Sequence, residues 1–204
     1  MWRAGRRLGA FVTAVTVATL TGCSGGGPQG GPATSAPTPI ERLNTAQMDV
    51  HRIPFCDLVP RTAVTAALGR PATGRASWGN GDNTRFVGGR GDRSQEFGCR
   101  FAAGDSVAEA WVFATPVGRA FAEQVSRDSS RQQGCRDVRG PVYGSPSRTQ
   151  ICDLPGGGVR VRHAGLFDRT WLTCQVSSPG PEAQVTRRAG AWCVQVANTL
   201  NTAR

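Results

Sequence analysis

The seven cysteines of this chain have the most restricted chemistry of any of its residues. None of them forms a Cys-x-x-Cys pair, and the two histidines, His51 and His163, lie far from any regular cysteine spacing. A structural zinc site needs sulfur and nitrogen ligands at short, recurring spacings. The sequence therefore predicts no metal site and leaves acylation and disulfide formation as the uses of cysteine.

Cys23 differs from the other cysteines because it follows an export signal. Three arginines precede an apolar run over residues 8–20, which is too short to cross a bilayer as a helix. Leu20-Thr21-Gly22-Cys23 then resembles the lipobox of bacterial lipoproteins, in which the cysteine is acylated and becomes the mature N-terminus. We expect residues 1–22 to be a lipoprotein signal peptide and Cys23 to be lipidated. The alternative is an ordinary secretory signal cut nearby.

Composition divides the rest of the chain into a linker and a domain. Residues 23–49 are predicted to be the lipidated Cys23 and a flexible linker. From 24 to 39, every residue except Gln29 is Gly, Pro, Ser, Thr or Ala, a composition that cannot bury enough apolar surface to fold. Residues 50–204 have the length of one domain.

Apolar periodicity predicts the elements of this domain. Side chains at helical spacing predict three helices, within residues 56–69, after Pro116 and after Pro181. Shorter apolar runs predict five strands, over residues 99–102, 109–115, 148–154, 159–163 and 170–176. Residues 74–98 are rich in Gly, Asn and charge and are expected to form a long loop.

This order of elements predicts an α+β fold, an antiparallel sheet with helices packed on one face. The two halves resemble a pseudo-repeat. Without Cys23, the cysteines form an even set, which outside the cytoplasm is typical of disulfides. We expect disulfide bonds to cross-link the domain through six cysteines: Cys56, Cys99, Cys135, Cys152, Cys174 and Cys193.

The segment Cys56-Asp57-Leu58-Val59-Pro60-Arg61, with Leu68-Gly69 behind it, resembles the opening of actinobacterial DUF3558-type lipoproteins. Those begin with Cys-x-Leu-Leu-Thr-Pro, a short helix and Leu-Gly, whereas here Pro60 replaces a threonine that can cap the helix. The likeness recurs at Cys99-Arg100-Phe101 and in the closing amphipathic helix. It implies an exported lipoprotein with no established enzymatic activity. The absence of lysine indicates a GC-rich genome, which fits an actinobacterium.

The resemblance also implies a disulfide between Cys56 and Cys99. Sequential pairing of the remaining cysteines joins Cys135 with Cys152, and it joins Cys174 with Cys193. The last bond would hold a predicted strand to the closing helix. Six cysteines allow 15 connectivities, so this pairing is a hypothesis.

Catalytic chemistry has little support. A hydrolase needs a nucleophile and a base in contact, and only His51 or His163 offers a base. His163 continues the side of Val159 and Val161 and is expected to be a surface or core histidine. The acids follow no motif spacing and are interpreted as solvated charges: Asp82, Asp92, Glu96, Asp105 and Glu109. We predict no catalytic residue, no cofactor and no enzymatic activity. The alternative is an envelope hydrolase in which His163 is the base.

The charge of the chain predicts its partners. The formal charge of +10 falls to +7 when the three arginines of the signal peptide are removed. Export excludes nucleic acid and leaves anionic envelope polymers or lipid headgroups. Arginines cluster at Arg136 to Arg139, at Arg160 with Arg162 and at Arg187 with Arg188, although codon usage alone can explain them.

The function expected from these features is a membrane-anchored, extracytoplasmic, non-enzymatic binding or sensing domain. The main alternative is a carrier of a lipid or small apolar molecule, with an apolar cavity between sheet and helices.

Overall fold

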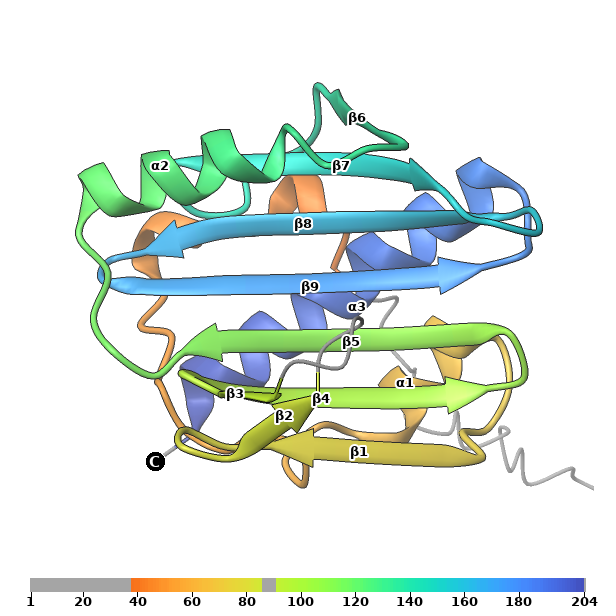
Figure 1. Ribbon diagram of the computed structural model, residues 1–204, viewed down its shortest axis with the longest axis horizontal. Helices are drawn as coiled ribbons and strands as arrows, with labels where there is room; N and C mark the ends of the chain where they lie inside the picture. The colour runs from red at the N-terminus through yellow and green to blue at the C-terminus, as the bar shows by residue number, and fades with distance from the viewer. Residues whose placement is uncertain (1–37, 86–90, 204) are drawn as a thin grey trace, which may run out of the picture. The chain divides into compact units, whose positions relative to one another are not determined.

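A seven-stranded antiparallel sheet organises the computed structural model, which describes residues 38–85 and 91–203 (Figure 1). Its strand order is β1-β4-β5-β9-β8-β7-β6. The strands are β1 (Gly74–Trp78), β4 (Glu96–Ala103), β5 (Ser106–Phe113), β6 (Cys135–Val138), β7 (Ser147–Asp153), β8 (Val159–Phe167) and β9 (Thr170–Ser178). A separate hairpin joins β2 (Asn83–Arg85) to β3 (Gly91–Arg93). The α+β prediction is confirmed.

Strict alternation along the central strands gives the sheet two different faces. In β5, Ala108, Ala110 and Val112 are fully buried, whereas Glu109 and Trp111 between them point to the opposite side and are only partly buried. Successive side chains of a strand point to opposite faces, so small apolar residues at every second position create a flat surface for helices. One face therefore forms the main core.

Helices α1 (Arg61–Leu68) and α3 (Glu182–Thr202) cover this core face. The predicted stripe of α3 is buried throughout: Val185, Ala189, Trp192, Val196 and Leu200. A 3-10 helix, η1 (Ile40–Arg42), is followed by another, η2 (Thr45–Gln47). Ile40 of η1 is buried against Gly190 of α3, so packed residues begin before residue 50. No helix within the described ranges is long and apolar enough to cross a membrane.

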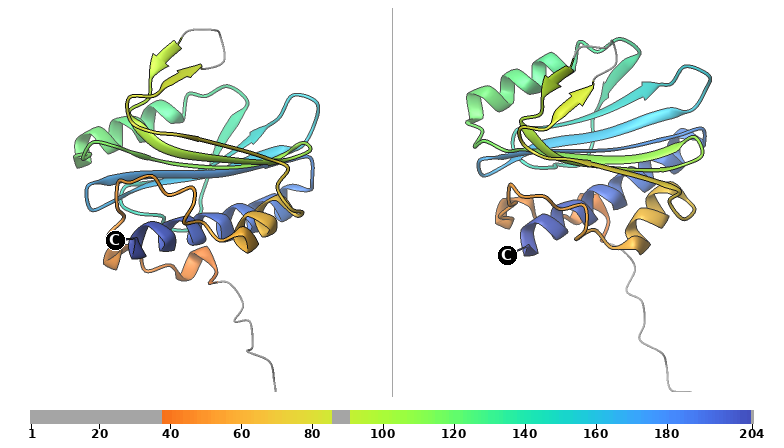
Figure 2. Two further views of the ribbon diagram at one scale, coloured as in Figure 1. Left: turned by 90° about the horizontal axis from the view of Figure 1, so that it is seen from below. Right: turned by 60° about the horizontal axis from the view of Figure 1, so that its bottom comes forward.

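The prediction that all helices pack on one face of the sheet is wrong for α2 (Arg119–Ser129). This helix lies on the opposite face of the sheet from α3 (Figure 2). It closes a second, smaller apolar cluster formed by Val117, Ala122, Ala164, Leu166 and Trp171. On this face, the side chains of β8 and β9 change from polar to apolar toward the end of β8 and the beginning of β9. Ala164, Leu166 and Trp171 lie there and provide this second surface. The pseudo-repeat is not confirmed, since the helices that follow the two groups of strands cover different faces.

Two edge strands differ from prediction. Residues 74–98, expected to be a loop, contain β1, β2, β3 and the start of β4, and β6 was not predicted. The side chains of β1 are largely exposed, so its sequence shows no alternation; its backbone pairs with β4 from Gly74↔Ala102 to Trp78↔Gly98. Edge strands with exposed side chains lack the signal that identified the central strands.

The sequential disulfide pairing is confirmed. Cys56 is bonded to Cys99, Cys135 to Cys152, and Cys174 to Cys193. The first bond ties the segment before α1 to β4, the second joins directly opposed residues of β6 and β7, and the third fastens β9 to α3. Cys23 lies outside the described residues.

The segment before β7 packs closely against β8 at Gly165. Tyr143 in that segment is fully buried, and its hydroxyl donates to the carbonyl oxygen of Cys193 at 2.9 Å. A Cβ on Gly165 would overlap the carbonyl oxygen of Tyr143. We expect Gly165→Ala to lower the free energy of unfolding by about 3 kcal/mol, the upper part of the range for overpacked cores. Urea unfolding measures this loss.

The matched control is Gly118→Ala, because nothing lies within 4 Å of the added methyl group at that position. Equal unfolding free energies for the two variants would contradict the close approach.

Candidate functional site

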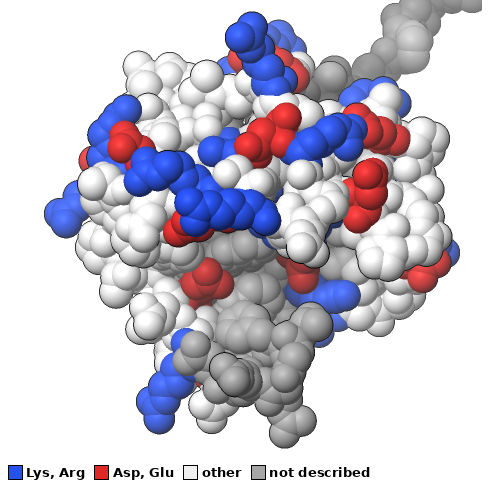
Figure 3. Space-filling view, turned by 45° about the horizontal axis from the view of Figure 1, so that its top comes forward, with Lys and Arg blue, Asp and Glu red and all other residues white. Residues whose placement is uncertain are grey.

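The sheet face that α3 does not cover carries charged and polar side chains between α2 and the β2–β3 hairpin. Seen in space-filling form, this side has basic and acidic residues gathered across it and is hollowed beneath them (Figure 3). The side chains come from the same alternation that buries the opposite face. This surface, the polar face, includes Arg100, Glu109, Trp111, Arg160, Arg162 and Gln175.

Arg162 is held in a fixed orientation at the centre of the polar face. Its Nε donates to Gln175 Oε1 at 2.9 Å, its Nη1 donates to Gln132 Oε1 at 3.3 Å, and its guanidinium lies 5.6 Å from the centre of the Trp111 ring. Among the described residues, its Nη2 has no acceptor. The arrangement presents an oriented donor to anything that enters the hollow.

Glu109 fixes this network from the neighbouring strand. Its Oε2 accepts from Gln175 Nε2 at 2.5 Å, and its Oε1 lies 3.5 Å from Arg100 Nε. The sequence interpretation of Glu109 as a solvated charge is therefore wrong, because its carboxylate is committed to two neighbours. Gln175 then holds Arg162 through its own amide oxygen.

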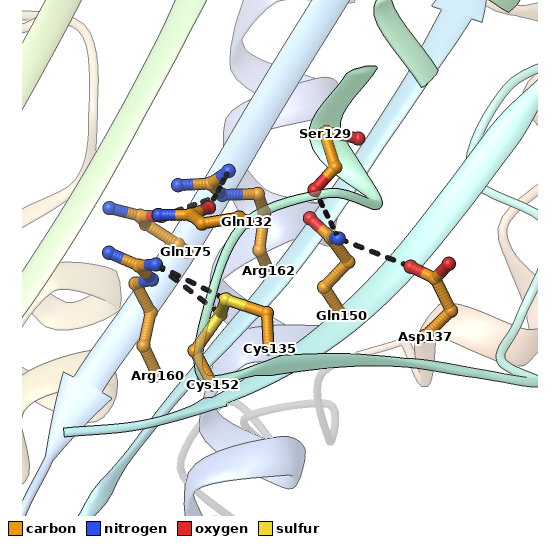
Figure 4. The surroundings of a disulfide bond; sticks show 9 residues. All are labelled: Ser129, Gln132, Cys135, Asp137, Gln150, Cys152, Arg160, Arg162 and Gln175. Atoms are coloured by element: carbon orange, nitrogen blue, oxygen red, sulfur yellow. Dashed lines mark hydrogen bonds between the residues drawn. A yellow bond between two sulfur atoms is a disulfide. The ribbon is translucent and has the colours of Figure 1, made fainter. Parts of the chain in front are cut away.

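Arg160 lies on the same face, two residues before Arg162 (Figure 4). Its Nη2 is 3.3 Å from Cys152 Sγ and 3.7 Å from Cys135 Sγ, the two sulfurs of one disulfide. Sulfur is a weak acceptor. Its Nε is buried and has no hydrogen-bond partner in the described part of the chain. Arg160 is thus a half-buried cation with unused donor capacity.

Arg160 and Arg162, the guanidinium pair, form no ion pair with a described carboxylate, and Glu109 attracts both from farther away. Burial lowers the pKa of Arg162 to about 10, with repulsion from Arg160 as the second cause and attraction from Glu109 opposing both. Burial also lowers the pKa of Arg160. Both groups are charged at neutral pH. Within the described ranges no carboxylate lies within 4 Å of either guanidinium, whereas Arg136 pairs with Glu182 and Arg148 with Asp137.

This distinction separates the arginine clusters that the sequence identified. The R-x-R spacing in β8 places both guanidinium groups on one face, a signal that the sequence carried. The partners of Arg136 and Arg148 come from other elements, so sequence alone could not show which arginines are neutralised. Gln132, Gln175 and Glu109 were also beyond prediction, because they lie in three separate parts of the chain: the α2–β6 connection, β9 and β5.

The other acids that the sequence interpreted as solvated charges lie in different surroundings. Glu96 is half-buried, and its pKa is raised to about 7 because burial outweighs a hydrogen bond from Trp78. Asp82 accepts from the backbone N–H of Gly79 at 2.6 Å, and Asp105 is exposed in the β4–β5 turn. The side chain of Asp92 lies outside the described part. In that part, no three His, Cys, Asp or Glu residues are grouped as metal ligands.

His163 is a core residue, 1% exposed, as one of the two sequence interpretations held. Its Nδ1 lies 3.0 Å from Thr149 Oγ1, and its ring packs beside Tyr143. The nearby Cys174 is bonded to Cys193, so its sulfur is no free nucleophile. The His163 ring therefore lies on the core side of β8, opposite the polar face. His51 is half-buried near the C-terminal end of α3, with its backbone N–H bonded to Leu200.

A groove of about 540 Å³ lies at the edge of the sheet, between α1 and β1. Val64 and Phe101 contribute apolar surface, but Asp57, Arg61 and Arg75 also line it, and Asp57 and Arg75 form an ion pair at 2.6 Å. A carrier of an apolar molecule would bury its cargo between sheet and helices. This groove lies at the edge of that interface, and its lining is partly charged.

No family model and no curated protein matches this chain, so the DUF3558 resemblance stays a prediction. Among solved structures, the extracellular domain of PknH from Mycobacterium tuberculosis is similar, with 13% sequence identity and a TM-score of 0.45 over 75% of this chain and 99% of that chain. A GTP-binding regulator from Thermotoga maritima is similar with 9% identity and a TM-score of 0.33, covering 70% of this chain and 91% of that chain.

The buried His163 should make stability depend on pH. Burial lowers its pKa to about 4 from an ordinary value of 6.5. As the pH falls below 6.5 the unfolded chain takes up a proton that the folded chain refuses until about pH 4. The stabilisation is full at neutral pH and is lost between about pH 6.5 and 4. The shift corresponds to about 3 kcal/mol.

Glu96 acts in the opposite sense, since its raised pKa makes the fold less stable as the pH rises toward 7. The measurement is therefore a difference: from pH 7 to pH 4, urea unfolding should show wild type losing about 3 kcal/mol more than His163→Gln. Parallel pH profiles for the two proteins would refute the assignment.

Proposed function

We propose that this protein is a lipid-anchored, extracytoplasmic binding or sensing domain, and that the guanidinium pair on its polar face binds a ligand with an anionic group. The observation that carries the proposal is the pair itself. Arg160 Nε is buried with no acceptor, Arg162 Nη2 has none among the described residues, and no described carboxylate lies within 4 Å of either group. An anion supplies the missing acceptors and the missing negative charge together.

Energetic reasoning supports a ligand here. A buried donor without a partner costs about 1–3 kcal/mol, and two neighbouring cations repel each other in a partly desolvated site. A phosphate or carboxylate held between the two guanidinium groups satisfies the donor and reduces the repulsion. Planar guanidinium groups donate paired hydrogen bonds to such oxygens. The Gln175–Glu109 connection holds Arg162 in place beforehand, which reduces the ordering cost of binding.

The extracytoplasmic location has independent support. The lipobox resemblance at Cys23 and the DUF3558 resemblance both indicate an exported lipoprotein, and three disulfides suit an oxidising compartment. In this proposal the chain is acylated at Cys23, residues 24–39 form a tether, and the domain acts at the membrane's outer face. His163 is 1% exposed in the core, out of reach of a ligand on the polar face, which supports binding rather than catalysis.

The anchor is tested by Cys23→Ala expressed in the native host. Removing the sulfur removes the acylation site, so the variant should leave the detergent phase in phase partitioning while wild type stays in it. Both proteins should be detected at similar total abundance. A mature variant that still partitions with the detergent would show that Cys23 is not the anchor.

The anion site is tested by titrating the oxidised chain with inorganic phosphate and following amide shifts by NMR. Arg160→Gln and Arg162→Gln should each weaken binding by about tenfold, since hydrogen bonds to charged groups contribute about 1.5–3 kcal/mol. The matched control is Arg119→Gln on α2, whose side chain is 67% exposed and paired with Glu123. It makes the same charge change outside the pair.

Equal weakening by all three variants would mean that phosphate responds to net charge alone and would overturn the site. Sedimentation with anionic and neutral vesicles then distinguishes a headgroup from a free anion as the source of the group.

A further inference from the structure

A pocket of about 140 Å³ adjoins Arg162 of the guanidinium pair, between α2 and the polar face. Trp111, Phe113 and Trp171 line it from the sheet, with Ala164 beside them and Val125 reaching down from α2. An apolar cavity of about 150 Å³ is large enough to hold benzene. Polar residues, among them Glu96 and Arg148, line the rest of the pocket. The volume and the three aromatic side chains suit one planar ring with a polar substituent.

Gln150 brings an unused acceptor to this pocket. Its side chain is 1% exposed, and its Nε2 donates to the Ser129 carbonyl oxygen at 2.8 Å and to Asp137 Oδ1 at 3.1 Å. These two acceptors decide which end of the amide is nitrogen. The oxygen, Oε1, is buried with no donor among the described residues, and Figure 4 shows it turned away from Asp137.

Arg162 brings an unused donor to the same pocket. It lies directly opposite Gln150 in the β7–β8 register, and both residues line the cavity. Its Nε and Nη1 are occupied by Gln175 and Gln132, which leaves Nη2. A buried acceptor and an oriented donor therefore stand on adjacent strands, at the wall of an aromatic pocket.

We propose that this pocket binds a planar ring carrying a carboxamide or lactam, whose N–H donates to Gln150 Oε1 and whose carbonyl oxygen accepts from Arg162. Such a group presents a donor and an acceptor side by side, in the complementary order. A carboxylate or a ketone has only acceptors and leaves Gln150 Oε1 unsatisfied. The proposal rests on the proposed function in that both use Arg162, and it adds an uncharged subsite beside the anion site.

The test compares three probes of similar size: benzamide, acetophenone and benzoate, each titrated into the oxidised full-length chain and followed by NMR. Benzamide should bind about tenfold more tightly than acetophenone, because only benzamide satisfies the buried oxygen. Benzamide should also bind more tightly than benzoate, despite the positive charge of Arg162.

Two variants locate the binding. Ala164→Leu fills the pocket and should abolish benzamide binding, whereas Thr65→Leu, which adds similar bulk in the separate groove beside α1, should leave it unchanged. Gln150→Met keeps the side-chain length and removes the acceptor, so it should reduce the preference for benzamide over acetophenone to about one. If Ala164→Leu fails to fold, Gln150→Met decides the question.

Equal affinities of benzamide and acetophenone for wild type, or tighter binding of benzoate, would overturn the proposal. If no ring probe binds while phosphate still binds at the guanidinium pair, a water satisfies Gln150 and this inference alone fails. If phosphate fails as well, the proposed function fails with it.

Discussion

The register of β8 between β7 and β9 is the constraint on which the rest of the structure depends. Val161 is fully buried and pairs with Ile151 and Val176, while Arg162, the next residue, pairs with Gln150 and Gln175 on the opposite side. A shift of one residue would place the guanidinium groups against α3 and valines against the polar face. The apolar stripe of α3 stabilises only one register, so packing on the core face determines which groups meet on the other.

Burial without neutralisation distinguishes the candidate site from the rest of the surface. Most exposed ion pairs, such as that of Arg119 with Glu123, contribute little to stability because water screens them. Arg160 and Arg162 are partly withdrawn from water without that compensation, and Gln150 keeps a buried oxygen unused. Proteins satisfy nearly all buried polar groups, so Arg160 Nε and Gln150 Oε1, two buried atoms with no partner among the described residues, mark a place where something outside the chain completes the bonding.

Helix α2 and the edge strand β6 form one side of this site. The Cys135–Cys152 bond holds β6 against β7, and the segment between α2 and β6 supplies Gln132 to Arg162. Ser129 and Asp137, from the end of α2 and from β6, orient Gln150. The disulfide therefore helps to position the site, although neither sulfur belongs to the proposed ligand contacts.

The amino-acid sequence by itself determined the features that depend on local periodicity: the central strands, the stripe of α3, the α+β class and the even set of cysteines. Local patterns are sufficient there because each element must present one apolar face to a common core. The edge strands β1 and β6 carry exposed side chains and acquire their structure from backbone pairing with a neighbour, which no local pattern encodes. The face chosen by α2, the neutralised state of Arg148 against the unpaired state of Arg162, and the orphaned oxygen of Gln150 were decided only by the tertiary structure. Each depends on a contact between residues far apart in the chain, and those contacts exist only once the sheet order is set.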